Sequence, residues 1–214
     1  MSNNENQAVT EPYAIVQSSL SKNIENYEKD KVLFDVVKLN INSVVFLIAV
    51  AVIFMALFHL IWKESEFYPD FLGILSIGYF PWYLILVVIA AVLLLHEGIH
   101  AIFFAIYAEH SFKSVKVGFL PANKLFTPYC HCKEIIKIKH YCIAAFMPMF
   151  ILGILPALLA LCIGNNVMLT WGILFIVSGY GDLCFLVKLR KEKSDDLVFD
   201  LPTDAGFTVY RKRG

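Results

Sequence analysis

The stretch WYLILVVIAAVLLLHEGIHAIFFAIYA, from Trp82 to Ala108, decides the fold. A helix rises about 1.5 Å per residue, so roughly 20 apolar residues are enough to cross the hydrocarbon core of a bilayer. This run is long enough to cross, yet it contains His96, Glu97 and His100, which are ionisable residues that hydrocarbon disfavours. The stretch therefore predicts a membrane-spanning helix that carries a polar site.

Three further apolar runs predict membrane-spanning helices, at residues 43–62, 142–163 and 167–188. We therefore expect an all-α multi-pass membrane protein with four transmembrane helices. The connection between the last two is only a few residues long, which makes them an antiparallel hairpin. The apolar stretch 71–80 is too short to cross and is followed by Pro81, so we expect an interfacial or re-entrant piece there.

The composition excludes several classes of protein. The chain has 214 residues, of which 58% are hydrophobic and 17% are charged, against about 45–50% and about 25% in soluble domains. Lys+Arg and Asp+Glu both number 18, which leaves no electrostatic footprint for nucleic acid. The five cysteines are an odd number and do not predict a disulfide framework. The polar N-terminus lacks the features of a signal peptide, so we expect the first span to be retained.

The distribution of Lys and Arg predicts the topology, because cytoplasmic segments are enriched in both. The five segments outside the predicted spans hold four, one, six, none and six of these residues in chain order, and Lys188 at the end of the last span is a seventh for the C-terminal tail. This pattern places both termini in the cytoplasm of a cell-membrane protein. We expect a polar cytoplasmic segment at 1–42, an integral membrane domain at 43–190 and a cytoplasmic tail at 191–214.

The loop between the second and third spans has a different pattern. Residues 114–120 alternate polar and apolar side chains, which is typical of a strand. Residues 121–124 form a turn, and a second strand is expected within 126–139. The loop therefore predicts a small cytoplasmic β-hairpin over residues 113–139.

His96-Glu97-Gly98-Ile99-His100 is an H-E-x-x-H motif within a helix. At 3.6 residues per turn the two histidines lie on one face, one turn apart, where both imidazoles can bind a single Zn²⁺. Glu97 is then placed as the general base toward a water molecule that the zinc activates. The motif predicts His96 and His100 as metal ligands and Glu97 as the catalytic residue.

A catalytic zinc site usually has three protein ligands, and Asp182 is the best candidate for the third. A histidine six residues after the motif is absent, because that position is Ile106, and Glu109 is too close in sequence to fold back. His96 and Asp182 lie equally far along two spans that run in the same direction, so they are expected at the same depth. We also expect Gly179 and Gly181 to let helices approach closely, and two prolines, Pro148 and Pro156, to open a water-accessible cavity.

These residues predict a zinc-dependent intramembrane metallopeptidase that acts on membrane proteins or peptides, whose extended segments could add to the hairpin edge. A metal-binding membrane protein without proteolysis, such as a carrier or a pseudoprotease, is the main alternative. An interaction scaffold, which would carry no zinc, is another. A haem protein is excluded, because two histidines on one helical face cannot bind opposite faces of one haem.

Other polar residues are interpreted more simply. Tyr129-Cys130-His131-Cys132 could form a second metal site, but neighbouring strand residues point to opposite faces, so we favour ordinary hairpin residues. His110, His131 and His140 are expected to be solvated loop residues. The basic stretch that begins at Lys188 is expected to anchor the topology. Residues 200–206 are interpreted as a turn without a chemical role.

HEGIH in a membrane helix with a distant aspartate resembles the site-2-protease type of intramembrane metalloprotease. The order of features is closer to a family of small bacterial membrane proteins named putative zincin peptidases. The resemblance covers most of the chain, from Val32 to Tyr210, and rests on residues 96–101, 116–119, 128–134, 181–182, 200–202 and 206–207. It implies a peptidase. The sequence Gly-Tyr-Gly-Asp at 179–182 departs from the Asn-Pro-Asp-Gly type of motif that holds the third ligand of site-2 proteases.

Overall fold

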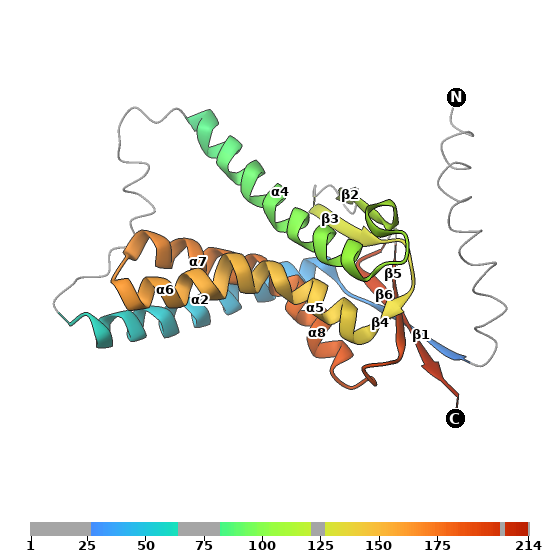
Figure 1. Ribbon diagram of the computed structural model, residues 1–214. Helices are drawn as coiled ribbons and strands as arrows, with labels where there is room; N and C mark the ends of the chain where they lie inside the picture. The colour runs from blue at the N-terminus through green and yellow to red at the C-terminus, as the bar shows by residue number, and fades with distance from the viewer. Residues whose placement is uncertain (1–26, 64–81, 121–126, 202–203, 214) are drawn as a thin grey trace.

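The computed structural model describes residues 27–63, 82–120, 127–201 and 204–213. The chain is mostly helical, and two small antiparallel sheets gather at one end of it (Figure 1). The principal helices are α2 (Val36–Ile61), α4 (Trp82–Tyr107), α5 (Ile138–Pro148), α6 (Leu155–Ile163), α7 (Asn166–Ser178) and α8 (Tyr180–Leu189). A π-helical turn, η3 (Met149–Ile154), joins α5 to α6, and a short 3-10 turn, η1 (Ser111–Ser114), follows α4. The predicted turn at 121–124 and the predicted re-entrant piece at 71–80 lie outside the described residues.

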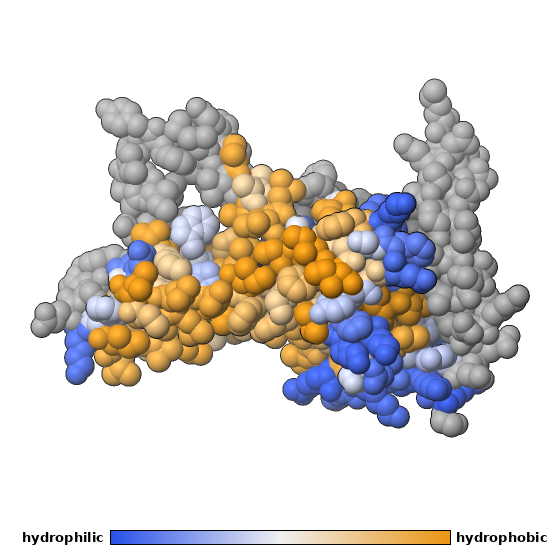
Figure 2. Space-filling model, viewed as in Figure 1, coloured by the Kyte–Doolittle hydropathy of each residue, from blue (hydrophilic) through white to orange (hydrophobic). Residues whose placement is uncertain are grey.

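Three helical segments in the described ranges are long and apolar enough to cross a membrane, namely Val36–Ile61, Ala90–Tyr107 and Ile138–Ile163. Helices α7 and α8 pass the same test together, but they are bent by 49° where they meet at Gly179. Apolar side chains cover the helices, whereas hydrophilic residues gather around the strands (Figure 2). The fold therefore has the surface of a membrane protein, with a bend that the sequence did not predict.

The first helix begins seven residues before the predicted span at residue 43. Asp35 caps it, because its Oδ1 accepts hydrogen bonds from the amides of Val37 and Lys38 at 3.0 and 3.2 Å. The apolar pattern shows where a helix can enter hydrocarbon, but the cap determines where the helix starts. The last residues of the predicted polar segment 1–42 are therefore helical.

Helices α6 and α7 form the expected antiparallel hairpin. Gly164 adopts a left-handed conformation with φ of 70°, and Asn165 caps α7 by accepting a hydrogen bond from the amide of Met168 at 2.8 Å. The two helices approach closely where a Cβ on Gly172 would lie 2.8 Å from the Cβ of Ala157. Helix α2 packs beside them, and its Trp62 indole donates to the carbonyl of Leu161 at 2.9 Å.

A four-stranded antiparallel sheet is the main departure from the predicted all-α fold. Its order is β1-β6-β5-β4, and its strands are β1 (Tyr27–Leu33), β4 (Ile136–Lys137), β5 (Leu197–Asp200) and β6 (Gly206–Lys212). Two of its strands come from the predicted cytoplasmic tail and one from the predicted polar N-terminal segment. The prediction missed the sheet because its strands come from segments far apart in sequence, whose pairing no single segment reveals.

The predicted hairpin is present as a second, two-stranded sheet. Strand β2 (Val115–Leu120) pairs with β3 (Thr127–Cys132), and Gly118 lies opposite Tyr129. The first strand matches the prediction, and the second occupies only the start of the range 126–139. Ile136 and Lys137, which had been included in the hairpin, belong instead to the larger sheet, where they pair with β5.

The buried core is divided into two main parts. One part lies among α2, α6 and α7 and includes Phe58, Leu169 and Ile173. The other joins α4, α5 and α8 to the larger sheet through Phe104, Tyr141, Leu189, Val198 and Phe207. The second part matters for function, because it fixes the strands against the helix that carries the H-E-x-x-H motif.

Candidate metal centre

Helix α4 presents the motif residues toward the inside of the molecule. His96, Glu97 and His100 are 7%, 9% and 5% exposed, whereas Leu94 and Leu95 of the same helix are exposed. The rings of His96 and His100 lie 4.9 Å apart between centroids and are inclined by 74°. One turn of helix therefore brings the two imidazoles together, as the spacing predicts.

Asp182 lies in the first turn of α8, directly after the bend at Gly179. Its Oδ2 is 3.4 Å from Nε2 of His96 and 3.4 Å from Nε2 of His100. One donor atom from each of the three residues lies within 4.8 Å of the other two. The structure thus brings together the three residues that the sequence predicts as metal ligands.

The two distances from Asp182 fit a tetrahedral metal ion, and all three donor atoms lie within 4.8 Å of one another. Two ligand atoms that are each about 2.1 Å from a tetrahedral zinc lie about 3.4 Å apart, which is the separation found between Asp182 and each histidine. Two imidazole nitrogens and one carboxylate oxygen are also a typical donor set for catalytic zinc. The arrangement leaves a fourth position for a small ligand.

Hydrogen bonding orients one histidine for this role. Nδ1 of His100 lies 2.9 Å from the backbone carbonyl oxygen of Ala144, which can only accept. The proton of a neutral His100 is therefore on Nδ1, and Nε2 keeps its lone pair toward Asp182. Nδ1 of His96 is buried and has no hydrogen-bond partner within the described ranges. The two histidines thus differ in how firmly their rings are held.

Two glycines near the site were expected to allow close helix packing, and two prolines to open a cavity. The structure agrees with only part of this expectation. A Cβ on Gly179 would lie 2.9 Å from Cβ of Met149, so close approach requires glycine there. A Cβ on Gly181 would meet nothing within 4 Å, so the prediction for this residue was wrong. Pro148 and Pro156 lie in a continuous helical segment, and neither lines the cavity that adjoins the site.

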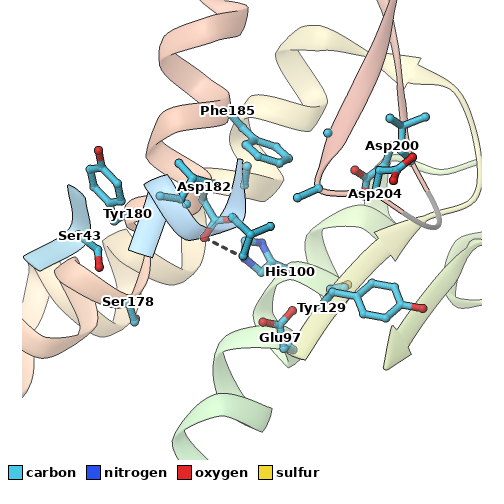
Figure 3. A pocket seen from close by; sticks show the side chains of 18 of the residues that line it. Ser43, Glu97, His100, Tyr129, Ser178, Tyr180, Asp182, Phe185, Asp200 and Asp204 are labelled. Carbon is cyan, nitrogen blue, oxygen red and sulfur yellow. Dashed lines mark ion pairs between the residues drawn. The ribbon is translucent and has the colours of Figure 1, made fainter. Parts of the chain in front are cut away.

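A cavity of about 460 Å³ adjoins the candidate site, and Glu97, His100 and Asp182 line it. Its walls come from α2, α4, α5, β3, the bend between α7 and α8, and the connection between β5 and β6 (Figure 3). Glu97 faces this cavity near Tyr129 of β3. Within the described ranges Glu97 has neither a hydrogen bond nor an ion pair, so its carboxylate is available to a ligand in the cavity.

A buried polar network that the sequence did not predict lies at another wall of the cavity. Nδ1 of His131 is 3.2 Å from Oδ2 of Asp200, and the hydroxyl of Tyr141 donates to Oδ1 of Asp200 at 3.3 Å. His131 is only 1% exposed, so its interpretation as a solvated residue was wrong. No local pattern could have revealed this network, because its members come from β3, α5 and β5.

The other two histidines have partners on the surface. His110 is largely exposed in the turn after α4 and lies 2.6 Å from Glu134, whereas His140 lies in α5 and not in a loop, and it stacks on Tyr107. Although burial alone would raise the pKa of Glu134, hydrogen bonds from the Ser114 hydroxyl, from His110 and from the amide of Glu109 hold it below the ordinary value. These contacts tie the end of α4 to the segment between β3 and β4.

The cysteines of β3 are better interpreted as ordinary hairpin residues than as ligands of a second metal ion. Burial raises the pKa of the Cys130 thiol well above its ordinary value and that of Cys132 to about 12. Burial thus disfavours the thiolate form that a metal ligand takes. Among the described residues, His96, His100 and Asp182 form the group of His, Cys, Asp and Glu side chains that could hold a metal ion.

The fold and the site together define a class of protein. Its helices are long and apolar enough to cross a membrane, and they carry a His–His–Asp group beside a glutamate. Residues 89–197, half of the chain, match the family described as "putative zincin peptidase", and the chain belongs to this family. The matched range contains the H-E-x-x-H motif and Asp182. No curated protein and no solved structure shows significant similarity to the chain.

Proposed function

We propose that the protein is a zinc-dependent intramembrane metallopeptidase that hydrolyses peptide bonds of membrane-associated proteins. The observation that carries the proposal is the placement of Asp182 at 3.4 Å from both histidines of an H-E-x-x-H helix. Membership of a peptidase family supports the same chemistry.

In this proposal His96, His100 and Asp182 would hold the ion. Zinc, when bound, polarises a carbonyl and lowers the pKa of a water molecule. Glu97 removes a proton from the attacking water as it adds to the scissile carbonyl carbon. Glu97 then delivers this proton to the leaving amine as the C–N bond breaks. The Glu97 carboxylate can take part in both steps, because no residue in the described ranges forms a hydrogen bond or an ion pair with it.

The larger sheet supports four membrane crossings. Strands β1, β4, β5 and β6 are hydrogen-bonded neighbours, so they lie on one side of the membrane. The chain must therefore cross an even number of times between β1 and β4, and again between β4 and β5. Helices α2 and α4 supply the first pair. The α5–α6 segment and the bent pair α7–α8 supply the second.

We further propose that this side is the cytoplasm of the cell, because the basic residues are concentrated in the segments that form or adjoin the sheet. The substrate would then be cleaved near the cytoplasmic end of its membrane segment. Strand β3 pairs with β2 along one edge, and Tyr129 and Cys130 of β3 line the cavity. An extended substrate segment could add to the other edge of β3.

Metal analysis combined with cleavage tests the proposal. Purified wild-type protein and the Glu97→Gln variant should each retain one equivalent of zinc, because Glu97 is not a ligand. The His96→Ala and Asp182→Ala variants should lose it. The wild type alone should cleave added membrane-protein substrates, as followed by mass spectrometry. Cleavage that persists in Glu97→Gln would rule out the mechanism, and zinc without any cleavage would favour a metal-binding protein that is not a protease.

A further inference from the structure

The cavity extends beyond the candidate metal centre to the connection between β5 and β6. Asp200 at the end of β5 and Asp204 before β6 both line it. Figure 3 shows these two aspartates together, apart from Asp182 and Glu97. The described lining residues include four carboxylates and neither lysine nor arginine. Even with a divalent ion beside Asp182, the cavity keeps an excess of negative charge.

The carboxylate of Asp200 is fixed in place before any ligand binds. Its side chain is 13% exposed, and its two oxygens accept hydrogen bonds from His131 at 3.2 Å and from Tyr141 at 3.3 Å. A carboxylate has about four acceptor positions, so two donors leave it capacity for another. A carboxylate held rigidly at a cavity wall loses little conformational entropy when it binds a cation.

Asp204 is more accessible than Asp200. It forms an ion pair with Lys31 of β1 at 3.4 Å, and both side chains are about half exposed. Exposed ion pairs of this kind contribute only about 0–1 kcal/mol, so another cation can replace Lys31 at little cost. Asp204 therefore adds an exposed carboxylate to the same cavity as the fixed carboxylate of Asp200.

Glu97, the catalytic residue of the proposed function, also faces this cavity. It is nine-tenths buried, and within the described part of the chain it has no hydrogen-bond or ion-pair partner. Burial of an unpaired carboxylate is costly, so this side chain is expected to meet a polar group inside the cavity. The same cavity continues to Asp200 and Asp204, so a ligand that reaches Glu97 can extend to them.

We propose that Asp200 and Asp204 form a subsite for a lysine or arginine side chain of the substrate, on the side of the scissile bond that faces the larger sheet. This inference rests on the proposed function and specifies its substrate class. Transmembrane segments carry Lys and Arg at their cytoplasmic flanks. A subsite of this charge would therefore select the basic flank of a membrane segment and place the adjoining peptide bond near Glu97.

The test uses synthetic membrane-segment peptides that differ at one flanking position, which is lysine, glutamine or glutamate. Their cleavage by the zinc-loaded full-length protein in nanodiscs is measured by mass spectrometry. Their binding is measured separately by fluorescence anisotropy with the Glu97→Gln variant, so that affinity does not depend on turnover. Both experiments are repeated with Asp200→Asn and Asp204→Asn, which keep side-chain size and remove charge.

We expect the lysine peptide to be cleaved about tenfold faster and bound about tenfold more tightly than the glutamine peptide. The glutamate peptide should be cleaved most slowly and bound most weakly. Either Asn substitution should bring the lysine-to-glutamine ratio close to one. Lys31→Ala should raise the ratio, because it removes the competing cation from Asp204. The matched control is Asp195→Asn. Asp195 is an exposed carboxylate that pairs with Lys137 and Lys139 away from the cavity, so this change should leave the ratio as it is in the wild type.

The outcomes separate this inference from the proposed function. Equal cleavage of all three peptides would refute the subsite and leave the peptidase standing. Lysine-selective binding that depends on Asp204, but without cleavage by the zinc-loaded protein, would support the subsite and refute the peptidase. Absence of both cleavage and selective binding would overturn the subsite.

Discussion

At the scale of single residues, backbone and side-chain partners define the site as much as the predicted ligands do. The carbonyl of Ala144 fixes the tautomer of His100, and the paired oxygens of Asp200 hold His131 and Tyr141 at the cavity wall. Motif spacing reveals the histidines, but it cannot reveal the groups that orient them. Those partners are identified only when α5, β3 and β5 are packed against α4.

Glu134 gives a prediction at this scale. Its pKa lies below the ordinary 4.5 in the folded protein, so its contribution to stability is present above pH 4.5 and is lost as the pH falls through the folded value. Glu134→Gln should lower the stability near neutral pH by about 1 kcal/mol, because neutral acceptors bind more weakly. The substitution should also make the stability depend less steeply on pH in the acid range. Thermal unfolding in detergent at several pH values measures both effects. The control is Glu28→Gln, on the exposed face of β1, whose pH profile should match the wild type.

At the scale of elements, close helix packing places Asp182. Helix α7 approaches both η3 and α6, where a Cβ on Gly153 would lie 2.8 Å from the backbone nitrogen of Ile176. The bend at Gly179 follows directly, and Asp182 lies in the first turn of α8 beyond it. The helices fit together because glycines stand at their crossing points, and this fit determines the position of the third candidate ligand.

Gly172→Ala tests this packing. The added methyl would lie 2.8 Å from the Cβ and backbone nitrogen of Ala157, so the helices must separate. We expect a loss of about 1–3 kcal/mol, measured as a lower midpoint of thermal unfolding in detergent. The matched change Gly181→Ala meets no atom within 4 Å and should leave the midpoint unchanged or raise it slightly. Equal effects of the two substitutions would mean that the α6–α7 contact does not limit stability.

At the scale of the whole molecule, the larger sheet constrains the topology. Tyr27 pairs with Lys212, and Ile136 pairs with Val198, so segments separated by the membrane helices are joined on one side. Arg211 strengthens this junction by donating to Glu192 at 2.7 Å and to Asp30 at 2.9 Å. In the proposed topology, the sheet thus joins the two ends of the chain at one face of the membrane.

Labelling from one side of the membrane tests this topology. In a variant without native cysteines, single cysteines at Glu28 and Lys193 should react with a membrane-impermeant maleimide from the same side. A cysteine at Asn165, in the turn between α6 and α7, should react from the other side. Intact cells and inverted vesicles distinguish the two sides. Opposite labelling of positions 28 and 193 would contradict the four-crossing arrangement and, with it, the pairing of β1 with β6.

The sequence by itself determined the apolar helices, the β2–β3 hairpin and the three residues that meet as a candidate metal site. The helices, the hairpin and the two histidines depend on periodicity, apolar length and fixed spacing along one helix, which are local properties, whereas Asp182 was identified from its equal depth in a second span. Only the tertiary structure decided the four-stranded sheet, the bend before Asp182, the burial of His131 beside Asp200 and the acidic extension of the cavity. Each of these depends on contacts between residues far apart in the chain, whose free energy is gained only when the helices and strands have packed.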